Sequence, residues 1–161
     1  MRERALLVAR SQAQALGLSD RIKWLGPRDQ AEVLEHYRLA DIFVLPCRVS
    51  ADGDRDGLPN VLMEAQSQGL ACISTPVSGI VELLEDGKNG RLVPPDDVAA
   101  LSAAIGSFIR SPEIRNAFGA AGMKKVRTLF DHRATISRLL DRFEESGFRP
   151  VSVALTSHAA Q

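Results

Sequence analysis

The chain has 161 residues, of which 45% are apolar and 25% are charged, the proportions of one ordinary soluble globular domain. This composition excludes a disordered chain, a collagen-like chain and a disulfide scaffold. The 20 Lys and Arg residues balance the 20 Asp and Glu residues, so no global field attracts nucleic acid or an anionic membrane. Any anionic ligand must therefore be held by local groups.

The hydrophobic pattern predicts alternating helices and strands. Helices are expected over residues 4–16, 30–39, 59–68, 80–84, 97–110, 112–127 and 132–145. Strands are expected over residues 21–25, 42–45, 71–74 and 91–93. We expect Gly17 to end the first helix, Asp29 to cap the second, the run Pro94, Pro95 and Asp96 to cap the helix at 97, and residues 87–90 to form a turn.

This alternation indicates the fold class. Right-handed crossovers between successive strands place them in parallel in one sheet, with helices on both faces. We therefore expect an α/β protein, a Rossmann-like three-layer sandwich with a mostly parallel sheet and extra C-terminal helices. No repeat or shift in composition marks a second domain, so one domain is expected over residues 1–146, followed by a flexible tail over 147–161.

The cysteines and the N-terminus show no pattern typical of metal binding, redox chemistry or secretion. Cys47 and Cys72 have no metal-ligand or CxxC spacing and are expected to be reduced core thiols; no metal site or metal cofactor is expected. The N-terminus lacks the apolar core of a signal peptide, and no apolar run approaches the roughly 20 residues that span a bilayer. A cytoplasmic protein is expected. A basic cluster allows at most a peripheral membrane contact; it consists of Lys124, Lys125, Arg127, Arg133 and Arg138.

The loop over residues 46–59 is the candidate functional segment, because ligands of parallel sheets bind at the carboxyl ends of the strands. Unpaired N–H groups over residues 58–61, where a helix starts, favour an anion. Asp56 lies just outside that helix and Glu64 one to two turns along it. Ionised carboxylates accept hydrogen bonds from sugar hydroxyls. Backbone donors for phosphate and two carboxylates for hydroxyls match a nucleotide-sugar.

The run DGLPNVLMEAQSQGLACISTPVSGIVELLEDGKNGRLVPPDD resembles the C-terminal, donor-binding domain of retaining GT-B glycosyltransferases. RLADIFVLPCR is similar to the strand that precedes the donor loop in this family, and the resemblance extends from about Leu6 to Phe143. It implies half of a GT-B fold and sugar transfer from a nucleotide-diphosphate sugar to a hydroxyl acceptor, with retention. The polysaccharide-biosynthesis branch is the most similar part of the group.

The resemblance also implies roles for individual residues. The acidic pair of the family, separated by seven residues, falls on Asp56 and Glu64, with Asp where the family usually has Glu. Asp56, the candidate catalytic residue, is expected to hold the transferred sugar together with the amides of Gly57 and Leu58. Glu64 is expected to bind the ribose hydroxyls. The shorter Asp leaves room for a different sugar or depth.

Further positions complete the implied donor site. The backbone around Asn60 and Val61 is expected to meet the diphosphate or ribose, and the loop with Pro27, Arg28 and Gln30 to lie against the base. The base itself, as UDP, GDP or ADP, stays open. The VGG of the family is here Val77, Ser78 and Gly79. At this tight turn only Gly79 is then free to adopt backbone conformations that other residues avoid.

One departure from the family keeps a second function open. Family members carry an N-terminal acceptor-binding domain, and this sequence shows neither that domain nor the Arg/Lys pair that neutralises the diphosphate. The chain is therefore either a glycosyltransferase or a non-catalytic donor-domain fragment or split-enzyme subunit that needs a separate acceptor-binding domain. A generic α/β interaction domain, without any response to nucleotides, is a third interpretation.

Overall fold

The structure is a computed structural model that describes residues 2–49, 57–130, 136, 141–142 and 145. The chain forms two compact units, Met1–Val33 and Leu34–Gln161. The division into a domain over 1–146 and a tail over 147–161 stays a prediction. Most of the helix expected over 132–145, and all of the tail, lie outside the described residues.

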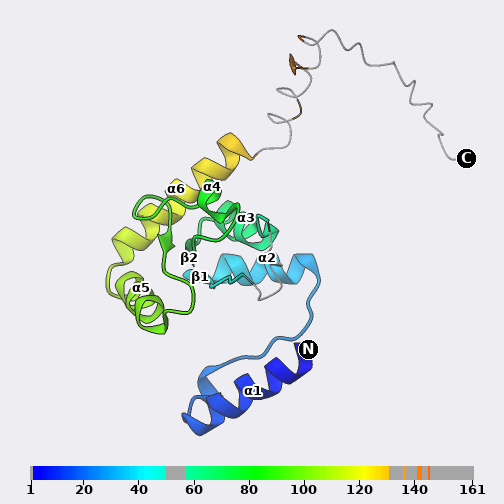
Figure 1. The fold of residues 1–161 in the computed structure, drawn as a ribbon, viewed down its shortest axis with the longest axis vertical. Helices are drawn as coiled ribbons and strands as arrows, with labels where there is room; N and C mark the ends of the chain where they lie inside the picture. The colour runs from blue at the N-terminus through cyan, green and yellow to red at the C-terminus, as the bar shows by residue number, and fades with distance from the viewer. Residues whose placement is uncertain (1, 50–56, 131–135, 137–140, 143–144, 146–161) are drawn as a thin grey trace, which may run out of the picture. The chain divides into compact units, whose positions relative to one another are not determined.

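The first unit contains helix α1, Arg2–Ala15, and a 3₁₀ turn, η1, Ser19–Arg21 (Figure 1). Gly17 has φ +66°, and the N–H of Leu18 donates to the Ala13 carbonyl at 2.8 Å, so Gly17 ends α1 as expected. The strand expected over 21–25 is wrong. Ile22 is extended, but in the described residues this segment has no strand to pair with, and extended backbone without a ladder is not a strand.

Helix α2, Gln30–Leu39, begins at the cap that the sequence predicts. The Asp29 carboxylate accepts a hydrogen bond from the N–H of Glu32 at 2.9 Å, and the Glu32 carboxylate accepts from the N–H of Asp29 at 3.3 Å. This reciprocal capping box satisfies two donors at the helix start and fixes where α2 begins.

A parallel sheet lies at the centre of the second unit, in the order β1, β2, β3. Its strands are β1, Ile42–Leu45; β2, Ala71–Ser74; and β3, Arg91–Leu92, close to the predicted ranges. β1 pairs with β2 from Ile42 opposite Ala71 to Leu45 opposite Ser74. β2 is buried at all four positions, as its wholly apolar or small side chains require in a central parallel strand.

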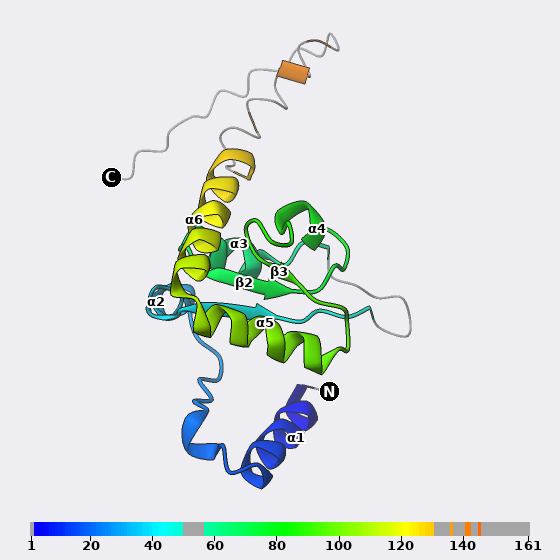
Figure 2. The same ribbon diagram turned by 90° about the vertical axis from the view of Figure 1, so that its left-hand side faces the viewer.

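Helices cover both faces of this sheet, which confirms the Rossmann-like α/β class. The helices after α2 are α3, Asn60–Ser67; α4, Ile80–Leu83; α5, Val98–Arg110; and α6, Pro112–Leu129, of which α3, α5 and α6 pack on the sheet. Figure 2 shows α3 and α5 on opposite sides of the sheet. On the α5 side, Ile73 and Phe108 are fully buried in one apolar cluster. On the other side, Tyr37 packs edge-on against Phe43 with ring centroids 5.5 Å apart.

The cap of α5 differs from the expected one. The Asp97 carboxylate accepts a hydrogen bond from the N–H of Ala100 at 2.8 Å, so Asp97 is the N-cap and α5 starts at Val98. Asp96 has φ +60°, which turns the chain into that cap. The run 94–96 leads to the helix but does not cap it, because the side chain that accepts from the first turn is that of Asp97.

Candidate functional site

The start of α3 presents backbone donors that its N-cap residue does not satisfy. Pro59, the N-cap, is extended and makes no side-chain cap hydrogen bond. Within the helix, the first N–H that finds a carbonyl is that of Leu62, which donates to Pro59 at 3.0 Å. Asn60 and Val61 precede it and are exposed. Helix geometry leaves their N–H groups without an intrahelical partner, so this end of α3 suits an anion, as the sequence predicts.

Glu64 lies one turn into α3 and is half-buried. Burial raises the pKa of the Tyr37 phenol, and the nearby charge of Glu64 raises it further. The two side chains are therefore close enough to interact, although one comes from α2 and the other from α3. Sequence reasoning singled out Glu64 but missed Tyr37, because nothing in the spacing of the chain joins the two helices.

Asp56 lies outside the described residues, so its pairing with Glu64 stays a prediction. The next described residues are Gly57, which is exposed, and Leu58, which is half-buried. Pro27 and Arg28 belong to the stretch that leads into α2, and Gln30 is the first residue of that helix; their role at the base stays a prediction as well. In that stretch the Arg28 guanidinium pairs with Glu32 at 3.3 Å.

The turn after β2 packs against the start of α3. The N–H of Ile80 donates to the Val77 carbonyl at 3.2 Å and closes a four-residue turn. Ser78 has φ +49° and Gly79 has φ −67°, the signs of a type II′ turn, which prefers glycine at its first central position. The expectation about Val77, Ser78 and Gly79 therefore needs correction: the left-handed backbone falls on Ser78, and Gly79 has an ordinary helical conformation.

Gly79 lies in a crowded place, where a side chain would press on its neighbour. A β-carbon at this position would lie 3.2 Å from the Leu58 Cβ and 3.4 Å from the Leu58 nitrogen. Its neighbour Ser78 has a buried Oγ without a hydrogen-bond partner in the described part of the chain. The turn thus brings residues 78 and 79 to the segment that leads into α3.

Two hydroxyls join the carboxyl ends of β1 and β2. The Ser74 Oγ donates to the Leu45 carbonyl and the Thr75 Oγ1 donates to the Cys47 carbonyl, each at 2.6 Å. These bonds hold the beginning of the 46–59 loop against the end of β2. Sequence analysis gave these hydroxyls no role, because their partners lie 28 and 29 positions away in the chain.

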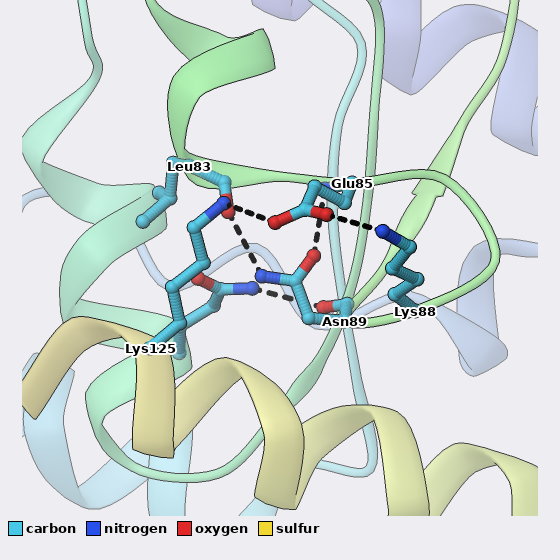
Figure 3. Close-up of polar contacts among 6 residues, drawn as sticks. Leu83, Glu85, Lys88, Asn89 and Lys125 are labelled. Atoms are coloured by element: carbon cyan, nitrogen blue, oxygen red, sulfur yellow. Dashed lines mark hydrogen bonds and ion pairs between the residues drawn. The ribbon is translucent and has the colours of Figure 1, made fainter. Parts of the chain in front are cut away.

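A buried network of side-chain amides holds the C-terminal end of α3 (Figure 3). The Asn89 side chain donates to the Leu83 carbonyl at 2.8 Å and accepts from the N–H of Glu85 at 2.7 Å. The Gln66 amide, on α3, donates to the Asn89 carbonyl at 2.9 Å. The predicted turn at residues 87–90 is therefore confirmed, and it anchors α3 two residues after Glu64.

Charged groups surround the same turn. Lys88 and Lys125 each donate to a different oxygen of the Glu85 carboxylate at 2.8 Å (Figure 3). These two hydrogen bonds, from Lys125 first and then Lys88, lower the pKa of Glu85 from 4.5 to about 2. Lys125 belongs to α6, so the pair ties that helix to the turn.

A pocket of about 160 Å³ opens beside α5, lined by Pro46, Cys47, Arg48, Val93, Pro94, Asp96, Asp97, Val98 and Leu101. Arg48 and Asp96 form an ion pair at its rim at 3.4 Å, and Asp97 caps α5. The charged groups of this pocket are thus engaged with the protein itself. Among the described residues, no three His, Cys, Asp or Glu side chains gather as metal ligands.

No helix in the described part of the chain is long and apolar enough to cross a bilayer. Cys72 is buried and Cys47 half-buried, and neither is in a disulfide. The expectation of a core thiol is thus confirmed for Cys72, whereas Cys47 lines the pocket beside α5.

Comparison with solved structures supports the fold. HepE from Anabaena, in complex with UDP and glucose, matches with a TM-score of 0.75 at 22% identity, over 89% of this chain and 37% of HepE. Sucrose-phosphate synthase from Thermosynechococcus elongatus matches with a TM-score of 0.71 at 24% identity, over 86% of this chain and 34% of the synthase. At these identities the likeness establishes the fold alone.

Comparison of sequences establishes the family. The chain is 35% identical to the amylovoran biosynthesis glycosyltransferase AmsK of Erwinia amylovora over 127 residues, 79% of this chain and 31% of AmsK. It is 44% identical to the putative colanic acid biosynthesis glycosyltransferase WcaL of Salmonella typhimurium over 93 residues, 58% of this chain and 23% of WcaL. The chain thus spans less than a third of either relative. The family model for glycosyl transferases group 1 matches residues 6–125, and the chain belongs to this family of GT-B proteins.

Proposed function

We propose that this chain binds the donor of a glycosyltransferase that moves a sugar from a nucleotide-diphosphate sugar to a hydroxyl acceptor, with retention, in polysaccharide or glycoconjugate biosynthesis. The observation that carries the proposal is the start of α3, where N–H groups without an intrahelical partner and the half-buried Glu64 lie at the carboxyl edge of a parallel sheet. The names of AmsK and WcaL support the polysaccharide role.

Backbone N–H groups and carboxylates bind different parts of the ligand. The N–H groups at the start of α3 hold the diphosphate, and Glu64 accepts hydrogen bonds from ribose hydroxyls. Asp56, with the amides of Gly57 and Leu58, holds the transferred sugar. The HepE structures with UDP and UDP-glucose support a nucleotide-sugar as ligand. Positioning and electrostatic stabilisation of the leaving diphosphate then supply the catalysis, without a metal ion.

Isothermal titration with UDP, GDP and ADP tests the binding step. At least one of the three should bind, and Glu64→Ala should weaken that binding about tenfold, as expected for a lost hydrogen bond to a charged group. Asp56→Ala should leave the free nucleotide bound and weaken the nucleotide-sugar. Glu82→Ala, at an exposed acid of α4, is the matched control and should change neither affinity. Equal affinities for the chain and both site variants would refute the assignment.

Transfer is tested separately, because the chain spans only 23% to 31% of the first relatives. Release of nucleotide diphosphate from the bound donor is followed with and without a hydroxyl acceptor. Turnover by this chain alone supports an enzyme. Binding without turnover supports the alternative, a donor-binding part that needs a separate acceptor-binding domain.

A further inference from the structure

The turn after β2 is strained and leaves one polar group unpaired. Ser78 has φ +49°, in the left-handed region that favours glycine. Its Oγ is buried and has no hydrogen-bond partner in the described part of the chain, whereas nearly all buried hydroxyls in proteins are paired. Glycine would avoid both the backbone strain and the unpaired hydroxyl, so the stability of the fold does not explain the serine.

The position of the turn suggests that explanation. Gly79, the next residue, lies against Leu58, with its β-position 3.4 Å from the Leu58 nitrogen. β1 and β2 are parallel neighbours, so the segments that follow them leave the sheet at the same edge. The turn with Ser78 is therefore part of the corner that leads into α3, where the N-cap residue Pro59 supplies no side-chain cap.

We propose that Ser78 is a ligand-binding residue of this corner, and that its hydroxyl donates a hydrogen bond to a phosphate oxygen of the nucleotide diphosphate; this inference rests on the function proposed above. An ionised phosphate only accepts hydrogen bonds, and the Ser78 hydroxyl is a donor without an acceptor. Phosphate therefore supplies the missing partner. Backbone strain of this kind concentrates at ligand sites, where binding offsets its cost.

The proposed contact requires the Ser78 side chain to rotate. Ser78 as a residue is half-buried, whereas its Oγ is covered. Solvent thus reaches the residue from a side other than that of the hydroxyl. A change of the χ1 rotamer moves Oγ between staggered positions about Cβ, and we expect one of them to face the ligand. In the unliganded chain the Ser78 hydroxyl is covered. When the diphosphate binds, the side chain rotates and the hydroxyl contacts it.

Two variants separate the hydroxyl from the strain. Ser78→Ala removes the hydroxyl and keeps a β-carbon in the left-handed region, whereas Ser78→Gly removes both. If the hydroxyl binds phosphate, both variants bind the nucleotide diphosphate about tenfold more weakly than the unsubstituted chain, although Ser78→Gly melts at a higher temperature. The affinity for the nucleoside, which lacks phosphate, stays equal in all three proteins.

Isothermal titration measures these affinities with whichever of UDP, GDP and ADP binds most tightly, and with its nucleoside. Ser107→Ala is the matched control, because the Ser107 hydroxyl donates to the Ala104 carbonyl within α5. Diphosphate binding by Ser78→Gly as tight as that of the unsubstituted chain overturns the role of Ser78 alone. If the unsubstituted chain binds none of the three nucleotides, the proposed function fails, and the Ser78 contact with it.

Discussion

Gly79 and Leu58 lie in contact although they come from different connections of the sheet: a β-carbon at Gly79 would meet the Leu58 Cβ at 3.2 Å. Gly79 follows β2, whereas Leu58 leads into α3. The start of α3 is therefore held in place by the neighbouring turn.

Gly79→Ala should therefore disturb the start of α3. The added methyl group forces Leu58 aside, and overpacking of this kind costs about 1 to 3 kcal/mol of unfolding free energy. Nucleotide affinity should fall as well, because the N–H groups of Asn60 and Val61 move with Leu58. Gly106→Ala is the control, since its β-carbon meets only the far end of the Arg110 side chain. Urea unfolding measures both variants; equal stabilities would contradict the contact.

Ser78→Gly should stabilise the protein by about 1 kcal/mol. Glycine removes the left-handed strain of a side chain and the unpaired buried hydroxyl, and its greater entropy in the unfolded state offsets part of the gain. Ser78→Ala should gain less, because the β-carbon remains. Thermal unfolding of the three proteins checks the order, and a melting temperature of Ser78→Gly below that of the original chain would disprove it.

Gly119→Ala should be among the most damaging single changes in α6. A β-carbon at Gly119 would collide with the backbone carbonyl oxygen of Gly69, and backbone cannot swing aside as a side chain does. We expect a loss of about 3 kcal/mol, at the upper end for overpacking. Asn116→Ala, at an exposed position of α6, should change little. Chemical denaturation measures both, and a loss under 1 kcal/mol for Gly119→Ala would mean that α6 shifts freely.

Glu85 should make stability depend on pH in the acid range. Its pKa is about 2 in the folded chain against an ordinary 4.5, because Lys125 and Lys88 donate to the carboxylate. The folded state thus releases this proton more readily than the unfolded state. The contribution is present above pH 4.5 and is lost as the pH falls from about 4.5 to about 2 (Figure 3).

Glu85→Gln should be less stable than the original chain at neutral pH, and the difference should shrink as the pH falls through that window. Glu82→Gln, at an exposed acid of α4, is the control for the loss of one charge. The measurement is denaturant unfolding at a series of pH values. A difference that stays constant from pH 6 to pH 2 would contradict the ion pairs with the two lysines.

Cys72 should react with iodoacetamide only when the chain unfolds. Burial raises the pKa of its thiol from 9.0 to about 12, so the reactive thiolate is almost absent at pH 8. Because the folded state holds this proton more tightly, stability should fall as the pH rises from about 9 to about 12. In Cys47→Ala, Cys72 is the remaining thiol of the two. Mass spectrometry of that variant, labelled with and without denaturant, checks the protection; fast labelling of the folded chain would refute it.

The sequence predicts the elements well where local chemistry decides them. Asp29 with Glu32 forms the cap of α2, Gly17 ends α1, and the short apolar runs at β1 and β2 become the sheet. In each case the signal and the structure that it produces lie within a few residues. The strand expected over 21–25 fails because a strand also needs a partner, which alternation within one segment does not supply.

In the candidate site, too, local features follow from the sequence and long-range contacts do not. The sequence by itself determined that a loop after a buried strand leads into a helix with Glu64, because hydrophobic period and proline placement are local properties. Only the tertiary structure decided that Tyr37 lies near Glu64, that Gly79 packs on Leu58 and that the left-handed backbone falls on Ser78. Those relationships join connections far apart in the chain, and they depend on how closely the packed elements approach one another.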